Sequence, residues 1–292
     1  MKAKKFTKFI IGLLAVLALL VWVQLAKSPT ADQAKNQVSV YYFNVGQGDS
    51  TLIEQGTTQI LIDGGPDQKV LAELGKAMPL GDRKIEFIVL THPHADHLVG
   101  LREVLDRYEV GTIYQTGVAS ETNLSLEFTN QITAKKIQSL VPALGESLIP
   151  FANGQLTFVW PGTQFVGKTI DNPNNSSLVT RFCYFGRCIF NPGDLEIEGW
   201  RSLEAYATTN QLDLKSDILK LAHHGSQNGT DQAVINLIQP QTAIISLGAD
   251  NRYGHPHQVV LDLLLKNNLP YFRTDRDGTI IYSMTELGLT KR

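Results

Sequence analysis

Thr91-His92-Pro93-His94-Ala95-Asp96-His97 places three imidazoles and a carboxylate within six consecutive positions. The segment follows a short apolar run, residues 85–90, and precedes residues 98–108, whose apolar side chains have helical spacing. We therefore expect it in a strand-to-helix loop, where a rigid scaffold presents chemical groups. Neutral imidazole suits zinc and its neighbours, and aspartate adds an oxygen that can balance the charge of a second ion. The segment predicts a two-metal hydrolytic centre, and a histidine-rich surface turn without metal is the alternative.

All seven histidines of the chain lie in three short segments. After the first motif come His223-His224 and then His255 with His257. Each segment follows a strand-like apolar run, at residues 85–90, 218–222 and 242–247. Since loops at one edge of a sheet lie near one another, the three segments are expected to meet in one pocket.

Strands and helices are expected to alternate along the chain. The predicted strands are residues 38–43, 50–54, 59–63, 85–90, 111–115, a β pair within 147–161, 177–184, 187–191, 216–222, 242–247 and two final strands. The predicted helices are residues 67–78, 98–108, 125–136, 196–205, 231–237 and 259–267. Mixed strands with interspersed helices indicate an α/β fold in which helices cover the sheets.

The N-terminus differs from the rest of the chain. Lys2, Lys4, Lys5 and Lys8 precede an apolar stretch of 18 residues, 9–26, which is near the lower limit for crossing a bilayer. A cleavable signal peptide is the alternative, but no small-x-small site ends the stretch. We expect a basic cytoplasmic tail at 1–8, a transmembrane signal-anchor at 9–26, a tether at 27–37 and a hydrolase domain at 38–292. This predicts a single-pass protein of the cell membrane with its domain outside the cytoplasm.

The part of the chain that is expected outside the cytoplasm has a net negative charge. Five of the 26 basic residues precede Ser28, which leaves 21 basic against 28 acidic residues and a net charge near −7. This balance argues against broad electrostatic capture of nucleic acid, although a local basic groove or bound divalent ions would offset it. Nothing in the sequence indicates an oligomeric state.

The two cysteines, Cys183 and Cys188, flank a four-residue segment with a strand-turn-strand pattern. If Phe185-Gly186 is a two-residue turn, the cysteines face each other as a non-hydrogen-bonded pair, where side chains are closest. Outside the cytoplasm such a pair can form a disulfide, and two buried thiols are the alternative.

The order of motifs resembles that of the metallo-β-lactamase superfamily. Leu61-Ile62-Asp63-Gly64-Gly65 ends a strand with an aspartate, and the H-x-H-x-D-H segment, Gly193-Asp194 and a late histidine motif follow. The resemblance covers about residues 38–283. It implies a metallo-β-lactamase-like αβ/βα four-layer sandwich with a dinuclear site between two β-sheets.

A narrower resemblance is to the C-terminal hydrolase domain of the competence protein ComEC. Four segments carry it: Asn44-Val45-Gly46-Gln47-Gly48-Asp49-Ser50, Asn175-Ser176-Ser177-Leu178-Val179, Leu219-Lys220-Leu221-Ala222-His223-His224-Gly225-Ser226 and Tyr253-Gly254-His255-Pro256. It implies metal-dependent cleavage of phosphodiesters, with DNA as substrate and a DNA-uptake channel as partner. The chain departs from that family at His94, where aspartate is common, and at Asn191-Pro192, where threonine is usual. It also lacks the many transmembrane helices of the channel.

The resemblance also implies a ligand set for two divalent ions, zinc or manganese. His92 and His94 would hold the first ion; Asp96, His97 and either His223 or His224 would hold the second; Asp194 would bridge both. A carboxylate can bridge two ions about 3.5–4 Å apart. No histidine lies between His97 and His223, so we expect residues 172–177 to give the first ion an oxygen or amide ligand, or to leave a position open. Fewer imidazoles make manganese credible beside zinc.

Further candidates have both a functional and a structural interpretation. Asp63 either orients the metal-bound histidines or only fixes its turn. Asn175 either contributes to the site or caps a turn, and His255 either protonates a leaving oxygen or is an ordinary loop residue. The remaining candidates for outer-sphere or substrate contacts are Asp49, Ser226 and Tyr253.

These observations favour a membrane-anchored, extracytoplasmic metal-dependent hydrolase of phosphodiesters, specifically a nuclease. Hydrolysis of a lactone or another cyclic ester or amide is a second hypothesis, because the same centre can attack a carbonyl carbon. A non-catalytic, metal-stabilised module that docks on a membrane assembly is a third.

Overall fold

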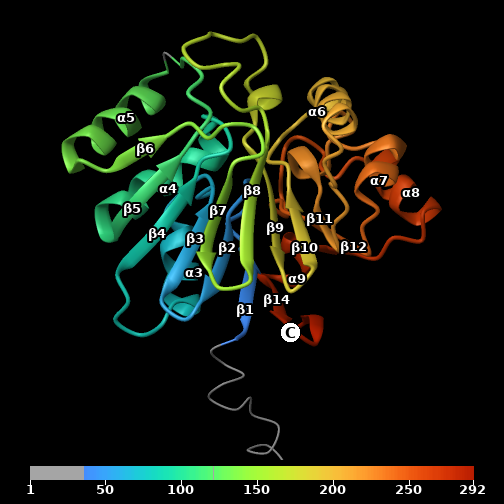
Figure 1. Cartoon of the computed structure of the whole chain (residues 1–292), viewed down its shortest axis with the longest axis horizontal. Coiled ribbons are helices and arrows are strands. Elements are labelled where there is room, and N and C mark those ends of the chain that lie inside the picture. The colour runs from blue at the N-terminus through green and yellow to red at the C-terminus, as the bar shows by residue number, and fades with distance from the viewer. Residues whose placement is uncertain (1–35, 121) are drawn as a thin grey trace, which may run out of the picture. The chain divides into compact units, whose positions relative to one another are not determined.

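Two facing β-sheets form the framework of the computed structural model, which describes residues 36–120 and 122–292 (Figure 1). The first sheet has the strand order β15-β14-β1-β2-β3-β4-β5-β6, and the second has the order β13-β12-β11-β10-β9-β8-β7. Strands β3 to β6 run parallel to one another, as do β10 to β13, and the other neighbours are antiparallel.

The strands of the first sheet are β1 (Val38–Tyr42), β2 (Thr51–Gln55), β3 (Thr58–Ile62), β4 (Lys84–Val89), β5 (Glu109–Tyr114), β6 (Gln138–Leu140), β14 (Ile280–Thr285) and β15 (Gly288–Lys291). Those of the second are β7 (Ser147–Phe151), β8 (Gly154–Trp160), β9 (Val179–Tyr184), β10 (Arg187–Asn191), β11 (Ile218–Lys220), β12 (Thr242–Ile245) and β13 (Tyr271–Arg273).

Helices cover the outer face of each sheet. The first sheet packs against α3 (Lys69–Ala77), α4 (Ala95–Arg107) and α5 (Asn123–Lys135), and the second packs against α6 (Ile197–Thr209), α7 (Gln232–Ile238) and α8 (Gln258–Lys266). The short elements η1 (Pro173–Ser176), η2 (Ala222–Gly225) and α9 (Thr274–Asp277) lie in connections. The layers are therefore helix, sheet, sheet and helix, which confirms the predicted αβ/βα sandwich.

Alternation along the strands explains why both faces of each sheet are apolar. In β3, Ile60 and Ile62 belong to the core between the sheets, whereas Leu61 belongs to the core under the first group of helices. Successive side chains of a strand point to opposite faces, so one strand contributes to both cores. Since each face is covered, adjacent residues of one strand can both be apolar, as are Ile88 and Val89 of β4, which belong to different cores.

The structure places the start of one helix earlier than the sequence predicted. Helix α4 begins at Ala95, three residues earlier than the apolar spacing indicated, so Asp96 and His97 lie in its first turn rather than in the preceding loop. His94 has an extended backbone and directly precedes the helix. The first histidine motif is consequently divided between a loop and a helix, and both parts are rigidly placed.

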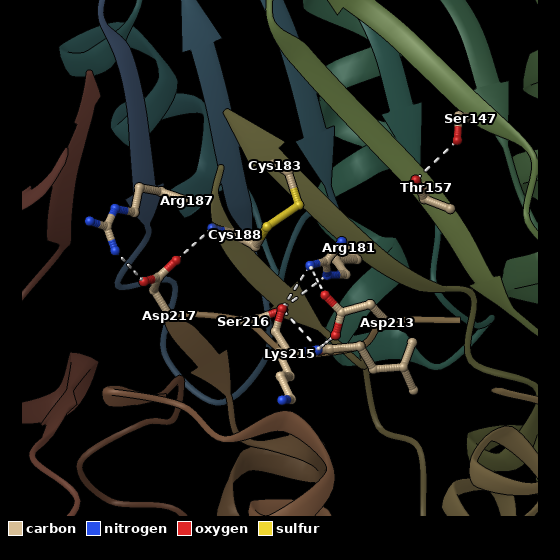
Figure 2. Close-up of a disulfide and its surroundings, with 11 residues drawn as sticks. Ser147, Thr157, Arg181, Cys183, Arg187, Cys188, Asp213, Lys215, Ser216 and Asp217 are labelled. Atoms are coloured by element: carbon tan, nitrogen blue, oxygen red, sulfur yellow. Dashed lines mark hydrogen bonds and ion pairs between the residues drawn. A yellow bond between two sulfur atoms is a disulfide. The ribbon is translucent and has the colours of Figure 1, made fainter. Parts of the chain in front are cut away.

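Cys183 and Cys188 form a disulfide across the β9–β10 hairpin, as Figure 2 shows. The turn between them is Phe185-Gly186, and both residues have positive φ, the conformation that two-residue hairpin turns favour. The hairpin is also attached to the start of β11, because Asp217 accepts a hydrogen bond from the Cys188 amide at 2.7 Å and one from Arg187 at 3.2 Å.

The predicted tail, signal-anchor and most of the tether fall outside the described residues. Within the described part, none of the helices combines the length and the apolar character needed to cross a bilayer.

Candidate metal centre

The three histidine segments lie together, although they come from different sheets. The first follows β4 of the first sheet, and the other two follow β11 and β12 of the second. The ring centroids of His92 and His97 are 4.2 Å apart, those of His97 and His224 are 5.5 Å apart, and those of His224 and His255 are 6.2 Å apart. The expected convergence of the segments on one place is therefore found.

Asp194 occupies the middle of this cluster. It lies in the turn after β10, and its side chain is only 2% exposed. Its Oδ2 atom is 3.3 Å from His97 Nε2, 3.4 Å from His224 Nε2, 3.9 Å from His223 Nε2 and 4.0 Å from His92 Nε2. Four imidazoles thus direct the same ring nitrogen toward one carboxylate oxygen, which is the position that the sequence analysis gave to a bridging ligand.

The donor set fits a divalent cation. Asp96, His97, Asp194 and His224 each offer one ligand atom, and these atoms all lie within 4.8 Å of one another. His97 Nε2 and Asp194 Oδ1 are buried and have no hydrogen-bond partner. Buried polar atoms are nearly always satisfied, so these two atoms indicate that an ion belongs among them.

Asp63 and Thr91 fix the ring of His97. Asp63 Oδ2 lies 2.8 Å from His97 Nδ1 and accepts a hydrogen bond from the Thr91 hydroxyl at 2.8 Å, while Oδ1 accepts from the Thr91 amide at 2.8 Å. A carboxylate on one imidazole nitrogen sets the orientation and basicity of the other. Asp63 therefore orients His97, and Thr91, which the sequence analysis did not single out, joins the ends of β3 and β4.

His224 is held in a similar way. Its Nδ1 atom lies 2.9 Å from the Ser246 carbonyl and 3.2 Å from Asp49 Oδ1, and its Nε2 atom lies 3.1 Å from Asp96 Oδ2. The protein thus holds His224 at its Nδ1 atom, while its Nε2 atom is one of the candidate ligand atoms described above. Asp49 accordingly contacts the site from the opposite side of the ring.

His223 approaches Asp194 from another direction. Its Nδ1 atom lies 3.2 Å from Glu196 Oε1. Both His223 and His224 have left-handed backbones, with φ of 51° and 55°, a conformation that costs non-glycine residues free energy. The two consecutive left-handed residues direct adjacent side chains to different sides of one carboxylate, which an ordinary strand or helix would not do.

The side-chain amides of the segment at residues 172–177 are bound to Glu196 and helix α6, which fits the expectation of an open position at the first ion. The side-chain amides of Asn172 and Asn174 donate to Glu196, at 2.8 and 3.0 Å. The side chain of Asn175 binds helix α6: its Oδ1 accepts from the Gly199 amide at 3.2 Å, and its Nδ2 donates to Glu198 at 3.3 Å. The segment therefore positions Glu196, which contacts His223, and of the two interpretations of Asn175 its side-chain contacts match the structural one.

Lys220 is a further charged group that the sequence analysis missed. It is fully buried at the end of β11, and its ammonium group forms an ion pair with Asp49, donates to the Gly193 carbonyl at 3.1 Å and lies 3.7 Å from Asp194 Oδ1. The available signal was a single charge inside the apolar run 218–222. A fully buried lysine requires a partner, and the partner here is part of the centre.

Burial and charge act in opposite directions on these groups. Burial raises the pKa of Asp194, but His224 and His97 together lower it well below its usual range. Burial lowers the pKa of His224 and of His97, but the surrounding carboxylates, Asp194 foremost, raise both well above the usual range. The surrounding carboxylates thus favour the protonated imidazoles, and a metal ion would compete with protons for the same nitrogens.

The remaining candidates lie at the margin. His255 is half-buried beside His223 and His224, and its Nδ1 atom has no hydrogen-bond partner. Burial, followed by the charge of His224, lowers the pKa of His255 to about 4. Ser226 Oγ accepts from the Asn228 amide at 3.3 Å, which is a local contact within its own turn. Tyr253 is 52% exposed and packs against His255.

Comparison with known proteins accords with this geometry. The Metallo-beta-lactamase superfamily profile matches residues 43–249. The chain belongs to this superfamily.

Curated relatives include proteins of DNA competence. The chain is 30% identical over 264 residues to ComE operon protein 3 of Bacillus subtilis (strain 168), covering 82% of this chain and 32% of that protein. It is 26% identical over 258 residues to Competence protein ComA of Neisseria gonorrhoeae, covering 87% and 33%. The chain thus spans about a third of the length of these relatives. It is a metal-dependent hydrolase of the metallo-β-lactamase fold, related to ComEC-type competence proteins.

Solved structures support the fold alone. The metallo-beta-lactamase fold protein YhfI from Bacillus subtilis has a TM-score of 0.56 and 12% identity, with 84% of this chain and 99% of that chain covered. Zn(2+)-bound PqqB from Methylobacterium extorquens has a TM-score of 0.51 and 13% identity, with 80% and 86% covered.

Proposed function

We propose that this superfamily member is a dinuclear metallohydrolase that cleaves phosphodiester bonds of DNA. One observation carries the proposal: Asp194 presents a single buried carboxylate to four imidazoles that arrive from both sheets. The similarity to competence proteins supports DNA as the substrate class.

The ligand assignment follows the two sides of Asp194. His92 and His94 would hold the first ion together with Asp194, and His223 presents a further nitrogen there. Asp96, His97 and His224 would hold the second ion, with Asp194 shared. Both members of the His223-His224 pair then act as ligands, and a ligand set without an oxygen or amide from residues 172–177 has a larger imidazole share. Such a set accepts zinc or manganese.

The protein's own groups hold and orient this centre. Divalent ions, when bound, polarise a phosphoryl oxygen and lower the pKa of a water molecule. Asp63 and Thr91 keep His97 aimed at Asp194, Glu196 keeps His223 in place, and Asp49 does so for His224. His255, with one unpartnered ring nitrogen beside the centre, is placed to donate a hydrogen bond to a leaving oxygen, and its lowered pKa favours the neutral ring in that role.

The nuclease proposal predicts cleavage by the full chain purified in detergent and loaded with zinc or manganese. Labelled single- and double-stranded DNA are compared with a lactone, and a chelated sample is the control. We expect strand cleavage that requires the divalent ion and depends only shallowly on monovalent salt, because a net acidic domain displaces few counterions. Product lengths will separate stepwise from internal cutting. Opening of the lactone with all DNA left intact would replace this proposal by an esterase function, and inactivity of fully metal-loaded protein on every substrate would favour a docking module.

We also propose that residues 9–26 anchor the chain in the cell membrane, with the domain outside the cytoplasm and a DNA-uptake channel as partner. The support is the basic tail, the apolar stretch and the similarity to competence proteins. Membranes washed with carbonate should retain the chain, and external protease should digest its domain. Recovery of a soluble mature form that begins near Ser28 or Asp32 would show instead that the stretch is a cleaved signal peptide.

A further inference from the structure

We infer that Tyr253 and Arg252 form a stacking platform for a nucleobase of a single-stranded substrate, immediately beside the metal centre. The inference rests on the proposed nuclease function and adds the form of the substrate: an unpaired strand whose bases are accessible. Three observations carry it, namely the hydrogen bonds that hold the loop at residues 248–257, the row of rings that leads out of the centre, and the exposure of the outermost ring.

Asn251 holds the loop in shape. Its Nδ2 atom donates to the Gly248 carbonyl at 2.9 Å and to the His255 carbonyl at 2.8 Å, and its Oδ1 atom accepts from the His255 amide at 2.9 Å. The Gly248 amide donates to Gln47 at 3.1 Å, which attaches this end of the loop to the Asp49 segment. Because these hydrogen bonds hold the tip of the loop, its side chains are presented with little conformational freedom.

The other end of the loop is attached to the histidine pair. The His257 amide donates to the Gly225 carbonyl at 3.0 Å, and His257 Nδ1 accepts from the Gln227 amide at 2.9 Å. These hydrogen bonds therefore fix the loop that carries Tyr253 relative to the metal ligands. Preorganised contacts bind a partner with a smaller entropic cost.

A row of rings leads outward from the ligands. The centroid of His255 is 5.6 Å from that of His223, and the centroid of Tyr253 is 5.7 Å from that of His255, with the planes of the latter pair only 25° apart. The guanidinium carbon of Arg252 lies 5.4 Å from the Tyr253 centroid. These separations are those of stacked aromatic and cation–π pairs. Tyr253 continues the row to the surface and is 52% exposed.

This arrangement has the two components that single-strand binding sites use. Aromatic side chains stack on bases of any sequence, and arginine adds both charge and stacking. The formal charge of the domain is negative, so local contacts of this kind have to provide the affinity for DNA that a broad basic surface would otherwise provide. In a duplex, the adjacent base pairs cover both faces of each base. The platform is therefore expected to favour an unpaired strand.

The test is equilibrium binding of the full, metal-loaded chain to a labelled phosphorothioate oligothymidine, which resists hydrolysis, and to the same strand made abasic throughout. We expect Tyr253→Ala to weaken binding of the thymidine strand about tenfold and to leave binding of the abasic strand within about twofold of wild type. Tyr253→Phe should retain the wild-type preference for bases. Phe185→Ala is the matched control, because Phe185 is another exposed aromatic residue, 37% exposed at the β9–β10 turn.

The platform would be overturned by equal losses on both strands, or by wild-type affinity of Tyr253→Ala for the thymidine strand. Absence of any single-strand binding by the wild-type chain would also overturn it. Cleavage of an unmodified strand is measured on the same preparations. Binding that depends on Tyr253, without cleavage, would support the platform and contradict the nuclease proposal. Cleavage by Tyr253→Ala at the wild-type rate would support the nuclease proposal and contradict the platform.

Discussion

Asp194→Asn is expected to eliminate hydrolysis and to remove metal from the protein at the same time. The substitution keeps the shape of the side chain but deletes the charge that four imidazoles surround. Changes to groups that only orient metal ligands typically cost about 10- to 100-fold in activity or affinity. Loss of the shared ligand itself should therefore lower kcat by more than about 100-fold. Metal content per chain, measured by elemental analysis beside kcat, checks both parts.

Asp213→Asn is the matched control for that experiment. Asp213 is a carboxylate of the same type, but it is 66% exposed and its salt bridge is with Arg181, at 3.5 Å and away from the centre. Wild-type metal content and turnover are expected for this variant. If Asp194→Asn retained two ions per chain together with wild-type turnover, Asp194 would not be a bridging ligand.

The location of the centre could be predicted from local features, because the three histidine segments each follow an apolar strand within a few residues. Composition and short-range spacing also indicated an α/β fold with helix-covered sheets, whereas the four-layer sandwich was implied by the resemblance in motif order. The expectation that the three segments share one sheet edge was too simple, since β4 lies in the first sheet and β11 and β12 lie in the second.

The supporting contacts could not be predicted, because they join residues that are distant in the sequence. Asp49 and Lys220 are 171 residues apart, and their pairing follows only when both sheets are in place. Glu196 was overlooked for a similar reason, since its role depends on η1 and η2 approaching the same carboxylate.

The uncertainty between His223 and His224 had a different origin. The resemblance implied one ligand from the pair without saying which, and neighbouring residues in a regular element point in different directions. Two consecutive left-handed residues remove that restriction, and no residue in the pair is a glycine that would have indicated such a backbone. The conformation costs free energy that the local sequence does not reveal, and contacts of both rings with Asp194 and its neighbours offset it.

Replacement of Lys220 by methionine is the substitution from which we expect the largest loss of stability. Methionine fills a similar volume, but it leaves the buried carboxylate of Asp49 without its cation. Breaking a buried ion pair on one side typically costs about 3–5 kcal/mol, because the remaining charge stays desolvated. The free energy of unfolding from urea titration of the metal-free protein measures this effect. Lys215→Met, at an exposed lysine nearby in sequence, should change it by less than about 0.5 kcal/mol.

The double variant Asp49→Asn/Lys220→Met separates the charge from the packing. It removes both charges together, and replacement of a whole buried pair is often close to neutral, so we expect it to recover most of the stability lost by Lys220→Met. Asparagine retains an oxygen that can accept from His224 Nδ1, which lies 3.2 Å from Asp49 Oδ1 in the wild-type protein. Metal content should therefore recover with stability. Additive losses in the two single variants and the double variant would show that Lys220 acts on the centre through Asp194 or Gly193 rather than through Asp49.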